Sequence, residues 1–365
     1  MRASACLFTG VLRRLVSTSP RTSGSSIILM FPGQGAQRVG MGLDLANEFA
    51  VARNVFEEVD EALGESLSKV MFHGDGAELT KTAKAQPALL AHSVAALRVL
   101  TKEHGIVPRG AVLGASVGEY AALVAAGSLS LPVAARLLRT RGEAMQAAAD
   151  ADAQARKTSH AMIAIVFSSD KLVSEIYKTI NDACERVSKD TGLVASLAAI
   201  NAPTQFVLSG HTAALDAVVK ALRVNNDTFI LRRAIPISVS APFHCAVMAP
   251  ATKALRAALD HIPIGDAHLA PLISGYNALE TTTALDVKDV LVKGVEATVR
   301  WTEAVAVAAA KIADKDNNNN DDDDSQQPHF LELGPGTTLS TFVRALRPNA
   351  RVSSVGNVSD VRKWV

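Results

Sequence analysis

The most constraining feature of this sequence is a short apolar run that leads directly into a Gly-x-Ser-x-Gly motif. Residues 110–114 have the length and character of a buried strand, and the Ala-rich residues 117–127 have those of a helix that ends at Gly127. A strand and a helix therefore meet at Ser116 with no room for a longer loop. Small residues on both sides let the backbone turn sharply and leave the serine hydroxyl exposed, as in a nucleophile elbow.

The rest of the chain alternates short apolar runs with longer helical stretches, which predicts the α/β class. Strand-like residues 26–31 precede a turn-rich Pro-Gly-Gln-Gly loop. Helical periodicity then marks residues 43–70, 85–104 and 132–151. A chain of 365 residues, of which 48% are apolar, is long enough for a core plus a subdomain.

The middle of the chain has its own rhythm of strands and helices. Strand-like runs occupy residues 162–167, 206–210 and 229–240, and helical stretches lie near 170–188 and 212–225. This alternation predicts a compact inserted subdomain.

The N-terminal residues 1–26 carry four arginines and several Ser and Thr but no acid, and the first carboxylate of the chain is Asp44. Arg-rich, Ser-rich, acid-poor N-termini are typical of mitochondrial transit peptides, so we expect the mitochondrial matrix as the location. A tail without a targeting role is the alternative. Three cysteines do not make a disulfide framework, which fits a reducing compartment.

A second biased segment, residues 313–328, has six acids, one Lys and almost no apolar residues. Such a run cannot offset its own ordering entropy, so we expect a disordered acidic loop. It lacks the Gly and the closing Glu of a calcium loop, which argues against a Ca²⁺ site. The net charge of +1 argues against a nucleic-acid binder, and the chain has no run of about 18 apolar residues, so we expect no membrane span.

A serine nucleophile needs a positioned base, which is usually a histidine. Among the nine histidines, His244 follows Ser-Ala-Pro-Phe at the end of a strand-like run, where Pro242 breaks the ladder and allows a side chain to point into a cleft. Spacing alone leaves two alternatives open. Ser116 could be only the cap of a Gly-rich turn, and His244 could be a structural histidine.

Eight motifs occur in one order along the chain: Phe31 to Gln37, Gln86 to Leu90, the Ser116 turn, Arg141 with Met145, Asn201 to Gly210, Ser240 to His244 with Met248 to Pro250, Val299 to Thr302, and Glu332 to Gly336. Together they resemble the malonyl-CoA:acyl carrier protein transacylase family over residues 27–346. The resemblance implies an α/β-hydrolase-like acyltransferase core of residues 27–159 and 237–365, with an inserted ferredoxin-like subdomain of residues 160–236.

The resemblance also implies a mechanism. Ser116 would attack the thioester of malonyl-CoA with His244 as base, and the malonyl group would then pass to the phosphopantetheine thiol of acyl carrier protein, for fatty acid synthesis. The backbone N–H groups of Gln34 and Val117 would hold the oxyanion. Arg141 would bind the malonyl carboxylate, because a guanidinium can donate two parallel hydrogen bonds to it.

Further positions follow from the same resemblance. Phe243 would crowd a methyl branch on the substrate, Gln86 and Asn201 would line the pocket, and the main-chain carbonyl of Gly294 would orient the histidine. The sequence departs from the family at Ala115, where a His is usual, which leaves the support of the serine loop in question.

The expected partners are malonyl-CoA and acyl carrier protein, with no nucleic acid, and the chain is expected to act as a monomer. No cofactor and no metal are expected, because the phosphopantetheine belongs to the carrier. Two other functions stay open: a serine thioesterase using the same turn, and a non-catalytic acyltransferase homologue that acts as a binding subunit.

Overall fold

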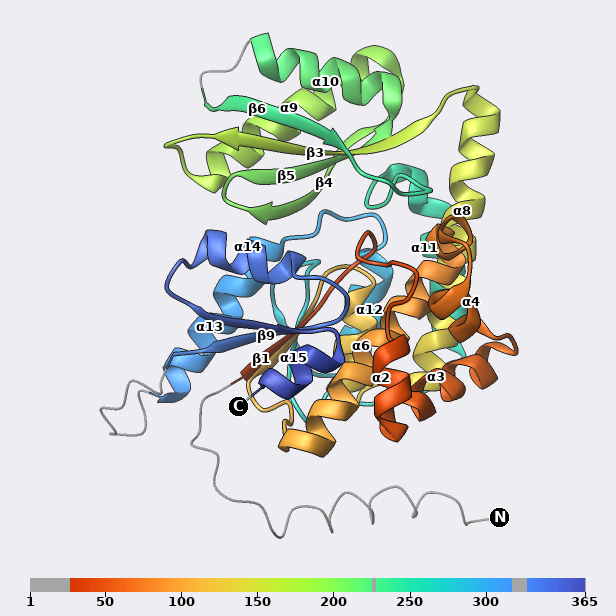
Figure 1. The fold of residues 1–365 in the computed structure, drawn as a ribbon. Helices are drawn as coiled ribbons and strands as arrows, with labels where there is room; N and C mark the ends of the chain where they lie inside the picture. Colours follow the sequence, from red (N-terminus) through yellow and green to blue (C-terminus); the bar gives the residue numbers. More distant parts are fainter. Residues whose placement is uncertain (1–26, 225–227, 317–326, 365) are drawn as a thin grey trace.

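The computed structural model describes residues 27–224, 228–316 and 327–364, so the expected targeting segment, residues 1–26, lies outside the described residues. The described chain forms one six-stranded and one four-stranded β-sheet. Figure 1 shows the smaller sheet and its helices above the larger one. The mixed α/β class predicted from the sequence is confirmed.

The larger sheet has the strand order β10-β9-β1-β2-β7-β8. The strands are β1 Ile27–Phe31, β2 Ala111–Gly114, β7 Leu272–Ile273, β8 Glu280–Thr281, β9 His329–Leu333 and β10 Arg351–Val355. Neighbouring strands are parallel except for β7 and β8. Because the carboxyl ends of parallel strands lie at the same edge of a sheet, the loops after β1, β2 and β9 gather at that edge.

Helices cover both faces of the larger sheet, which explains why its strands read as continuous apolar runs. Successive side chains point to opposite faces, so Ile28 and Met30 join the core formed with α13 and α14, whereas Leu29 and Phe31 join the core formed with α6, α7 and α8. These helices are α6 Thr82–His104, α7 Gly118–Ala125, α8 Leu131–Arg156, α13 Trp301–Asp316 and α14 Thr338–Leu346.

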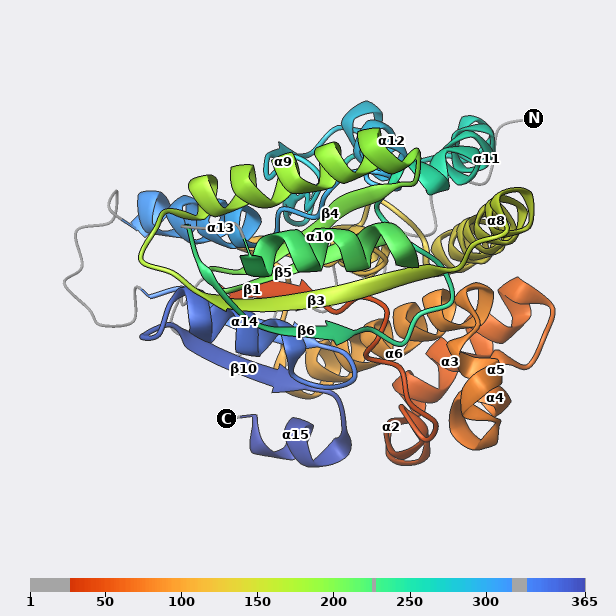
Figure 2. The ribbon, with the colours of Figure 1, turned by 90° about the horizontal axis from the view of Figure 1, so that it is seen from above.

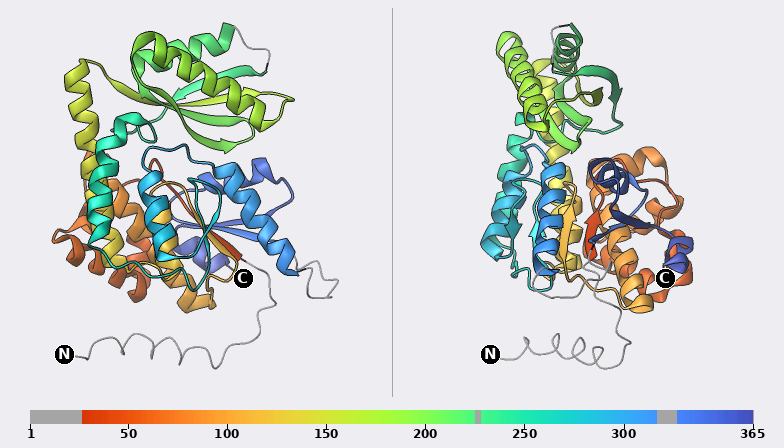
Figure 3. Two further views of the ribbon diagram at one scale, coloured as in Figure 1. Left: turned by 180° about the vertical axis from the view of Figure 1, so that it is seen from behind. Right: turned by 90° about the vertical axis from the view of Figure 1, so that its left-hand side faces the viewer.

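The remaining helices of the larger part are α2 Leu43–Glu48, α3 Ala50–Leu63, α4 Leu67–His73, α5 Gly76–Thr80, α11 Ala249–Asp260, α12 Ala284–Lys293 and α15 Val358–Lys363. The periodicity of residues 43–70 is divided among three of them, because Phe49 is extended and Gly64 adopts a left-handed φ of 65°. Figure 3 shows α8 running along the side of the molecule from the larger part toward the smaller one.

The smaller sheet is antiparallel with the order β4-β5-β3-β6. Its elements are β3 His160–Ser168, α9 Val173–Thr191, β4 Ala195–Ala202, β5 Gln205–His211, α10 Thr212–Val224 and β6 Ile230–Pro236. Figure 2 shows α9 and α10 lying over this sheet. Strand β4 was not predicted from the sequence, because its small Ala and Ser residues give no strong strand signal. It pairs with β5 along most of its length.

The two faces of the smaller sheet have different neighbours. Ile163 and Ile165 of β3 pack with α9 and α10. Met162 and Ala164, which alternate with them along the strand, face a cavity on the side of the larger sheet. Alternation along a strand thus gives this sheet one core face and one face for a site.

Helix α13 continues to Asp316, so the first residues of the stretch expected to be a loop, 313–328, complete a helix instead. Ala and Lys both have good helix propensity, which favours the last turn of this helix. Residues 317–326 of the expected acidic loop lie outside the described residues. Among the helices that the structure describes, none is long and apolar enough to cross a membrane.

Candidate active site

A cavity of about 320 Å³ lies where the carboxyl edge of the larger sheet meets the smaller sheet. Ser116, from the turn after β2, and Gln34, from the loop after β1, line its floor, and Ala199 and Val207 of the smaller sheet line the opposite wall. His244 reaches it from the segment that follows β6. Residues far apart in sequence therefore meet in one cleft.

Ser116 occupies the strand–turn–helix corner that the sequence predicts, and it has a left-handed φ of 54°. The flanking glycines make the corner possible. A Cβ on Gly114 would come within 2.1 Å of the backbone N of Glu119, and one on Gly118 within 2.1 Å of the carbonyl oxygen of Phe31. Larger residues at either position would push the turn away from the sheet. Backbone strain of this kind is held only where the surroundings fix it, and it is concentrated at functional sites.

His244 also has a left-handed φ, of 59°, and its Nε2 lies 2.8 Å from Ser116 Oγ. Its Nδ1 lies 3.0 Å from the carbonyl oxygen of Ala297. An Nδ1–H that donates to this carbonyl leaves Nε2 free to accept the serine proton. The ring is thereby held in the tautomer that a general base needs.

The expectation that the carbonyl of Gly294 is the hydrogen-bond acceptor is wrong, because the bonded carbonyl belongs to Ala297. Gly294 still has helical dihedral angles at the end of α12, and the chain turns toward the histidine only after it. The Gly294 carbonyl is close enough to raise the pKa of His244 slightly, as a lesser contribution.

Burial, and then the nearby charge of Arg141, lower the pKa of His244 to about 4. Both causes disfavour the imidazolium, so the ring is neutral at physiological pH and ready to accept a proton. Ser116 and His244 thus form a nucleophile and base pair in hydrogen-bond contact.

Arg141 is buried on α8 and donates from Nη2 to Ser116 Oγ over 3.1 Å and from Nη1 to Gln86 Oε1 over 2.8 Å. Its Cζ also lies 6.0 Å from the centre of the Tyr120 ring. A buried cation is costly unless it is hydrogen-bonded, and within the described residues no carboxylate lies at ion-pair distance from this one. The guanidinium therefore lies beside the nucleophile without a direct ion pair, and the buried Glu119 carboxyl acts on it only at longer range.

Gln86 does not line the cavity as the sequence reading expected. It lies behind Arg141 with no exposed surface and bonds the guanidinium there. Helix α6 packs against α8, which places Gln86 behind Arg141 rather than at the cavity wall. Asn201 and Phe243 do line the cavity.

The backbone N–H groups expected to hold an oxyanion belong to Gln34 and Val117, and both residues line the cavity. Val117 caps the N-terminus of α7, where the first N–H groups have no partner within the helix. The N-terminus of α7 is the positive end of the helix dipole, which suits a developing oxyanion at this edge of the cavity. Ala115 also lines the cavity, and its N–H donates to the Phe31 carbonyl over 3.0 Å.

Glu119 is a buried carboxyl that the sequence reading did not single out. Its Oε1 accepts hydrogen bonds from Ser274 Oγ at 2.9 Å and from the Gly275 N–H at 2.6 Å. Burial raises its pKa to about 7. Its position in the first turn of α7, three residues after Ser116, was the available signal.

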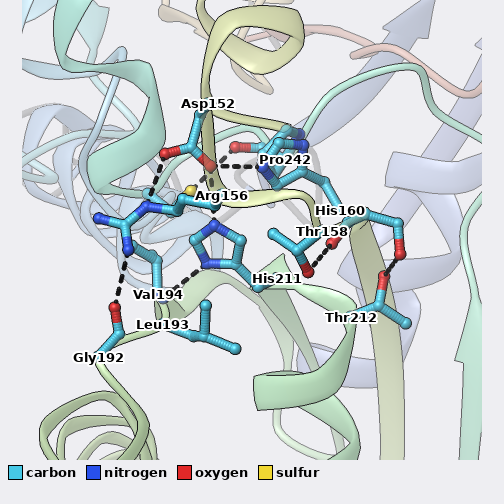
Figure 4. Close-up of polar contacts among 12 residues, drawn as sticks. Asp152, Arg156, Thr158, His160, Gly192, Leu193, Val194, His211, Thr212 and Pro242 are labelled. Carbon is cyan, nitrogen blue, oxygen red and sulfur yellow. Dashed lines mark hydrogen bonds and ion pairs between the residues drawn. The ribbon is translucent and has the colours of Figure 1, made fainter. Parts of the chain in front are cut away.

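One group of potential metal ligands occurs among the described residues, formed by Asp152, His160 and His211 (Figure 4). Both imidazoles bond the same oxygen, Asp152 Oδ2, at 2.9 and 2.8 Å. The backbone N–H of Val194 donates to His211 Nδ1, so the ring proton lies on Nε2, where a metal would have to bind. Hydrogen bonds thus account for this cluster, and the Val194 N–H holds His211 in a tautomer that does not fit a metal ion at Nε2.

A neutral histidine bonded to a serine, beside a cation that is fixed from behind, suits transfer of an acyl group that carries a negative charge. The class of protein that this fold and site define is an acyltransferase with a serine nucleophile. The chain belongs to the acyl transferase domain family, which matches residues 28–315, and within it to the malonyl CoA-acyl carrier protein transacylases.

Relatives support this membership over nearly the full length. The chain is 37% identical to the malonyl CoA-acyl carrier protein transacylase of Bacillus subtilis (strain 168), over 92% of this chain and 94% of that protein. It is 32% identical to the corresponding protein of Escherichia coli (strain K12), over 90% of this chain and 96% of that one.

Solved structures agree with the sequence relatives. An acyl carrier protein S-malonyltransferase from Vibrio cholerae superposes with a TM-score of 0.79 at 31% identity, covering 93% of this chain and 99% of that one. A malonyl-transacylase in complex with its type II PKS acyl-carrier protein superposes with a TM-score of 0.77 at 30% identity, covering 93% and 98%.

Proposed function

We propose that this chain transfers the malonyl group from malonyl-CoA to the phosphopantetheine thiol of an acyl carrier protein, and so supplies fatty acid synthesis. The observation that carries the proposal is the contact of one serine oxygen with two groups: Ser116 Oγ lies 2.8 Å from His244 Nε2 and 3.1 Å from Arg141 Nη2. The first contact supplies a nucleophile, and the second supplies a cation for the malonyl carboxylate.

In the first half of the reaction His244 Nε2 takes the Ser116 proton as Oγ attacks the thioester carbonyl. The oxyanion that forms accepts hydrogen bonds from the backbone N–H groups of Gln34 and Val117, and each such donor contributes about 3 kcal/mol. When the carbonyl reforms, the C–S bond breaks and His244 returns the proton to the CoA thiolate. The product is a malonyl ester of Ser116.

In the second half His244 takes the proton of the phosphopantetheine thiol, whose sulfur attacks the ester carbonyl. The C–O bond to Ser116 breaks, and His244 gives the proton back to Oγ. Serine is regenerated, and both steps use one base and one pair of oxyanion donors. Each proton comes from Ser116 or from the attacking thiol and moves through His244, so these two steps use no cofactor.

Arg141 selects the acyl group by its charge. Once Ser116 is acylated, its oxygen is a weaker acceptor, and Nη2 is released to bind the malonyl carboxylate. Gln86 keeps Nη1 in place during this exchange. An acetyl group offers no carboxylate and gains nothing from the cation. Phe243, buried at the cavity wall, leaves little room for a branch on the acyl chain.

The acyl carrier protein is proposed as partner because a malonyl-transacylase of the same fold was solved in complex with an acyl-carrier protein. We also propose that the chain acts as a monomer. Sedimentation of the purified protein tests this, and a stable dimer at micromolar concentration would contradict it.

The test of the proposed activity is to incubate residues 27–365 with malonyl-CoA and to locate the adduct by mass spectrometry. We expect a malonyl group on the peptide that contains Ser116, and its loss when holo acyl carrier protein is added. If water hydrolyses the Ser116 ester faster than the carrier thiol accepts its acyl group, the thioesterase alternative is favoured. No adduct on a folded protein would favour the non-catalytic binding subunit, although neither alternative accounts for Arg141 beside the nucleophile.

Residues 1–26 are proposed to direct the protein to the mitochondrial matrix, on the grounds of their arginines and their lack of acids. A fluorescent reporter fused to these residues should enter mitochondria, and one with its four arginines replaced by Gln should not. Equal distribution of the two reporters would contradict the proposal.

A further inference from the structure

Thr82 joins two catalytic segments that are far apart in the sequence. It is the first residue of α6 and has no exposed surface. Its Oγ1 lies 3.2 Å from Gln34 Nε2 and 2.6 Å from Ser240 Oγ. Gln34 belongs to the loop that offers an oxyanion donor, and Ser240 begins the segment that carries His244.

The number of hydrogen bonds that the Thr82 hydroxyl can make suits a position between two loops. A threonine hydroxyl can accept two hydrogen bonds and donate one. The Nε2 group of Gln34 can only donate, so Oγ1 accepts there, and one further bond joins Oγ1 to Ser240 Oγ. A buried hydroxyl that loses its partners costs about 1 to 3 kcal/mol, so the bridge resists opening.

Helix α6 gives the bridge a rigid base. Thr82 and Gln86 are four residues apart and therefore lie on one face of the helix. Helix α8 packs tightly at the same point: a Cβ added to Gly142 would lie only 2.7 Å from the carbonyl oxygen of Thr82. One helical turn thus holds the Gln34 loop, the Ser240 segment and, through Gln86, the guanidinium of Arg141.

The segment held by Ser240 needs such support. Only three residues separate Ser240 from His244, whose φ of 59° is unfavourable for a residue with a side chain. Strained backbone persists where its surroundings over-determine it. Loss of the bridge would let the base drift relative to the oxyanion donor, and displacements of about 1 Å can reduce rates by about a hundredfold.

We propose that Thr82 is a positioning residue for the transfer reaction, which fixes the distance between the oxyanion loop at Gln34 and the base at His244 through one buried hydroxyl. This inference rests on the proposed function for the identity of the two segments. It adds a residue that touches neither the substrate nor the reacting atoms.

The test compares Thr82→Val, which keeps the shape and removes the hydroxyl, with Thr82→Ser, which keeps the hydroxyl. We expect Thr82→Val to lower kcat for malonyl transfer by about 10 to 100-fold while KM for malonyl-CoA changes little, and Thr82→Ser to recover most of the loss. Thr101→Val, at an exposed position of the same helix, is the matched control. Equal losses in both Thr82 variants, or an unchanged kcat in Thr82→Val, would overturn the proposal.

A second readout does not depend on malonyl transfer. A fluorophosphonate, which labels activated serines, should react with Ser116 more slowly in Thr82→Val, and amide hydrogen exchange should increase in residues 33–37 and 240–244. If the wild-type protein reacts with the probe but not with malonyl-CoA, the proposed substrate is wrong while the positioning role stands. Unchanged labelling and exchange in Thr82→Val would reject the positioning role whatever the substrate.

Should Thr82→Val not fold, Ser240→Ala removes the other side of the bridge at an exposed residue. We expect the same pattern, a lower kcat with nearly constant KM, at about a third of the effect on a logarithmic scale, because Gln34 stays bonded to Thr82. If both variants fold, the double variant should be no slower than Thr82→Val alone. A wild-type kcat in a folded Ser240→Ala protein would contradict the proposed bridge.

Discussion

Arg141 Nη2 donates a hydrogen bond to Ser116 Oγ over 3.1 Å, so the cation of the site touches the nucleophile before any substrate arrives. Because Gln86 holds the other end of the guanidinium, the cation cannot swing far from this position. The carboxylate of a malonyl ester on Ser116 would find its partner already in place. Preorganisation of this kind avoids the cost of ordering the arginine during the reaction.

Replacement of Arg141 by Ala should abolish the preference for malonyl over acetyl groups. Charged hydrogen bonds contribute about 1.5 to 3 kcal/mol, so kcat/KM for malonyl-CoA should fall by about 10 to 100-fold or more, with a much smaller change for acetyl-CoA. Steady-state kinetics with both thioesters measure the ratio. Arg136→Ala, an exposed arginine on the same helix, serves as the control. An unchanged malonyl to acetyl ratio in Arg141→Ala would show that the carboxylate binds elsewhere.

The pH dependence of Ser116 reactivity should follow His244. Because burial and the charge of Arg141 lower its pKa to about 4, kcat/KM should be flat at neutral pH and fall only as the pH drops toward 4. Arg141→Met removes a positive charge that disfavours the imidazolium, so the pKa should rise and the acid limb should move to higher pH. Labelling of Ser116 by a fluorophosphonate measures both profiles, because the probe does not need the carboxylate site. An acid limb that stays in place would mean that Arg141 does not act on His244.

Gly118→Ala should disrupt the serine corner. The added Cβ would meet the carbonyl oxygen of Phe31 at 2.1 Å, so β1 and α7 must separate. Overpacking typically costs about 1 to 3 kcal/mol, and we expect a lower thermal midpoint together with slower acylation of Ser116. Gly76→Ala is the matched control, because the nearest atom to its added Cβ is a side-chain carbon of Val39 at 4.0 Å. Comparable midpoints for the two variants would contradict the steric argument.

Asp152→Asn should destabilise the attachment of the smaller sheet to α8. One carboxylate oxygen accepts from His160 and His211 and the other from Arg156 Nε, whereas Asn offers one neutral acceptor oxygen and an NH2 that cannot accept, so we expect a loss of about 1 to 3 kcal/mol at neutral pH. Asp150→Asn, two residues away on the exposed side of α8, is the control.

The difference in the free energy of unfolding between the wild-type protein and Asp152→Asn should decrease as the pH falls. Although partial burial opposes it, hydrogen bonds from the two histidines hold the pKa of Asp152 below its usual value. A lowered carboxyl pKa contributes stability that is present above the unfolded pKa and is lost as the pH falls through the folded one. Denaturant unfolding near pH 7 and near pH 3 should therefore show a smaller difference in the acid. A difference that grows on acidification would contradict this reading.

Much of this protein follows from local sequence. Apolar runs predict β1 and β2, and the spacing of Gly114, Ser116 and Gly118 predicts the corner that exposes the serine. These features depend on sterics and periodicity within a few residues, which is why they can be read without a structure. The order of the motifs pointed to His244 as the partner of Ser116, across 128 positions.

The tertiary structure decided what distant segments do to one another. The carbonyl that bonds His244 belongs to Ala297 and not to Gly294 as expected, because the turn after α12 sets which carbonyl faces the ring. The tertiary structure moved Gln86 behind Arg141, and it revealed Thr82 between two loops that are 48 and 158 positions away. The sequence by itself determined the corner that exposes Ser116, since short-range sterics suffice for it. The network that aligns base, oxyanion donors and cation was decided only by the packing of α6 against α8 and of the smaller sheet over the larger one, because hydrogen-bond geometry depends on where the helices lie in space.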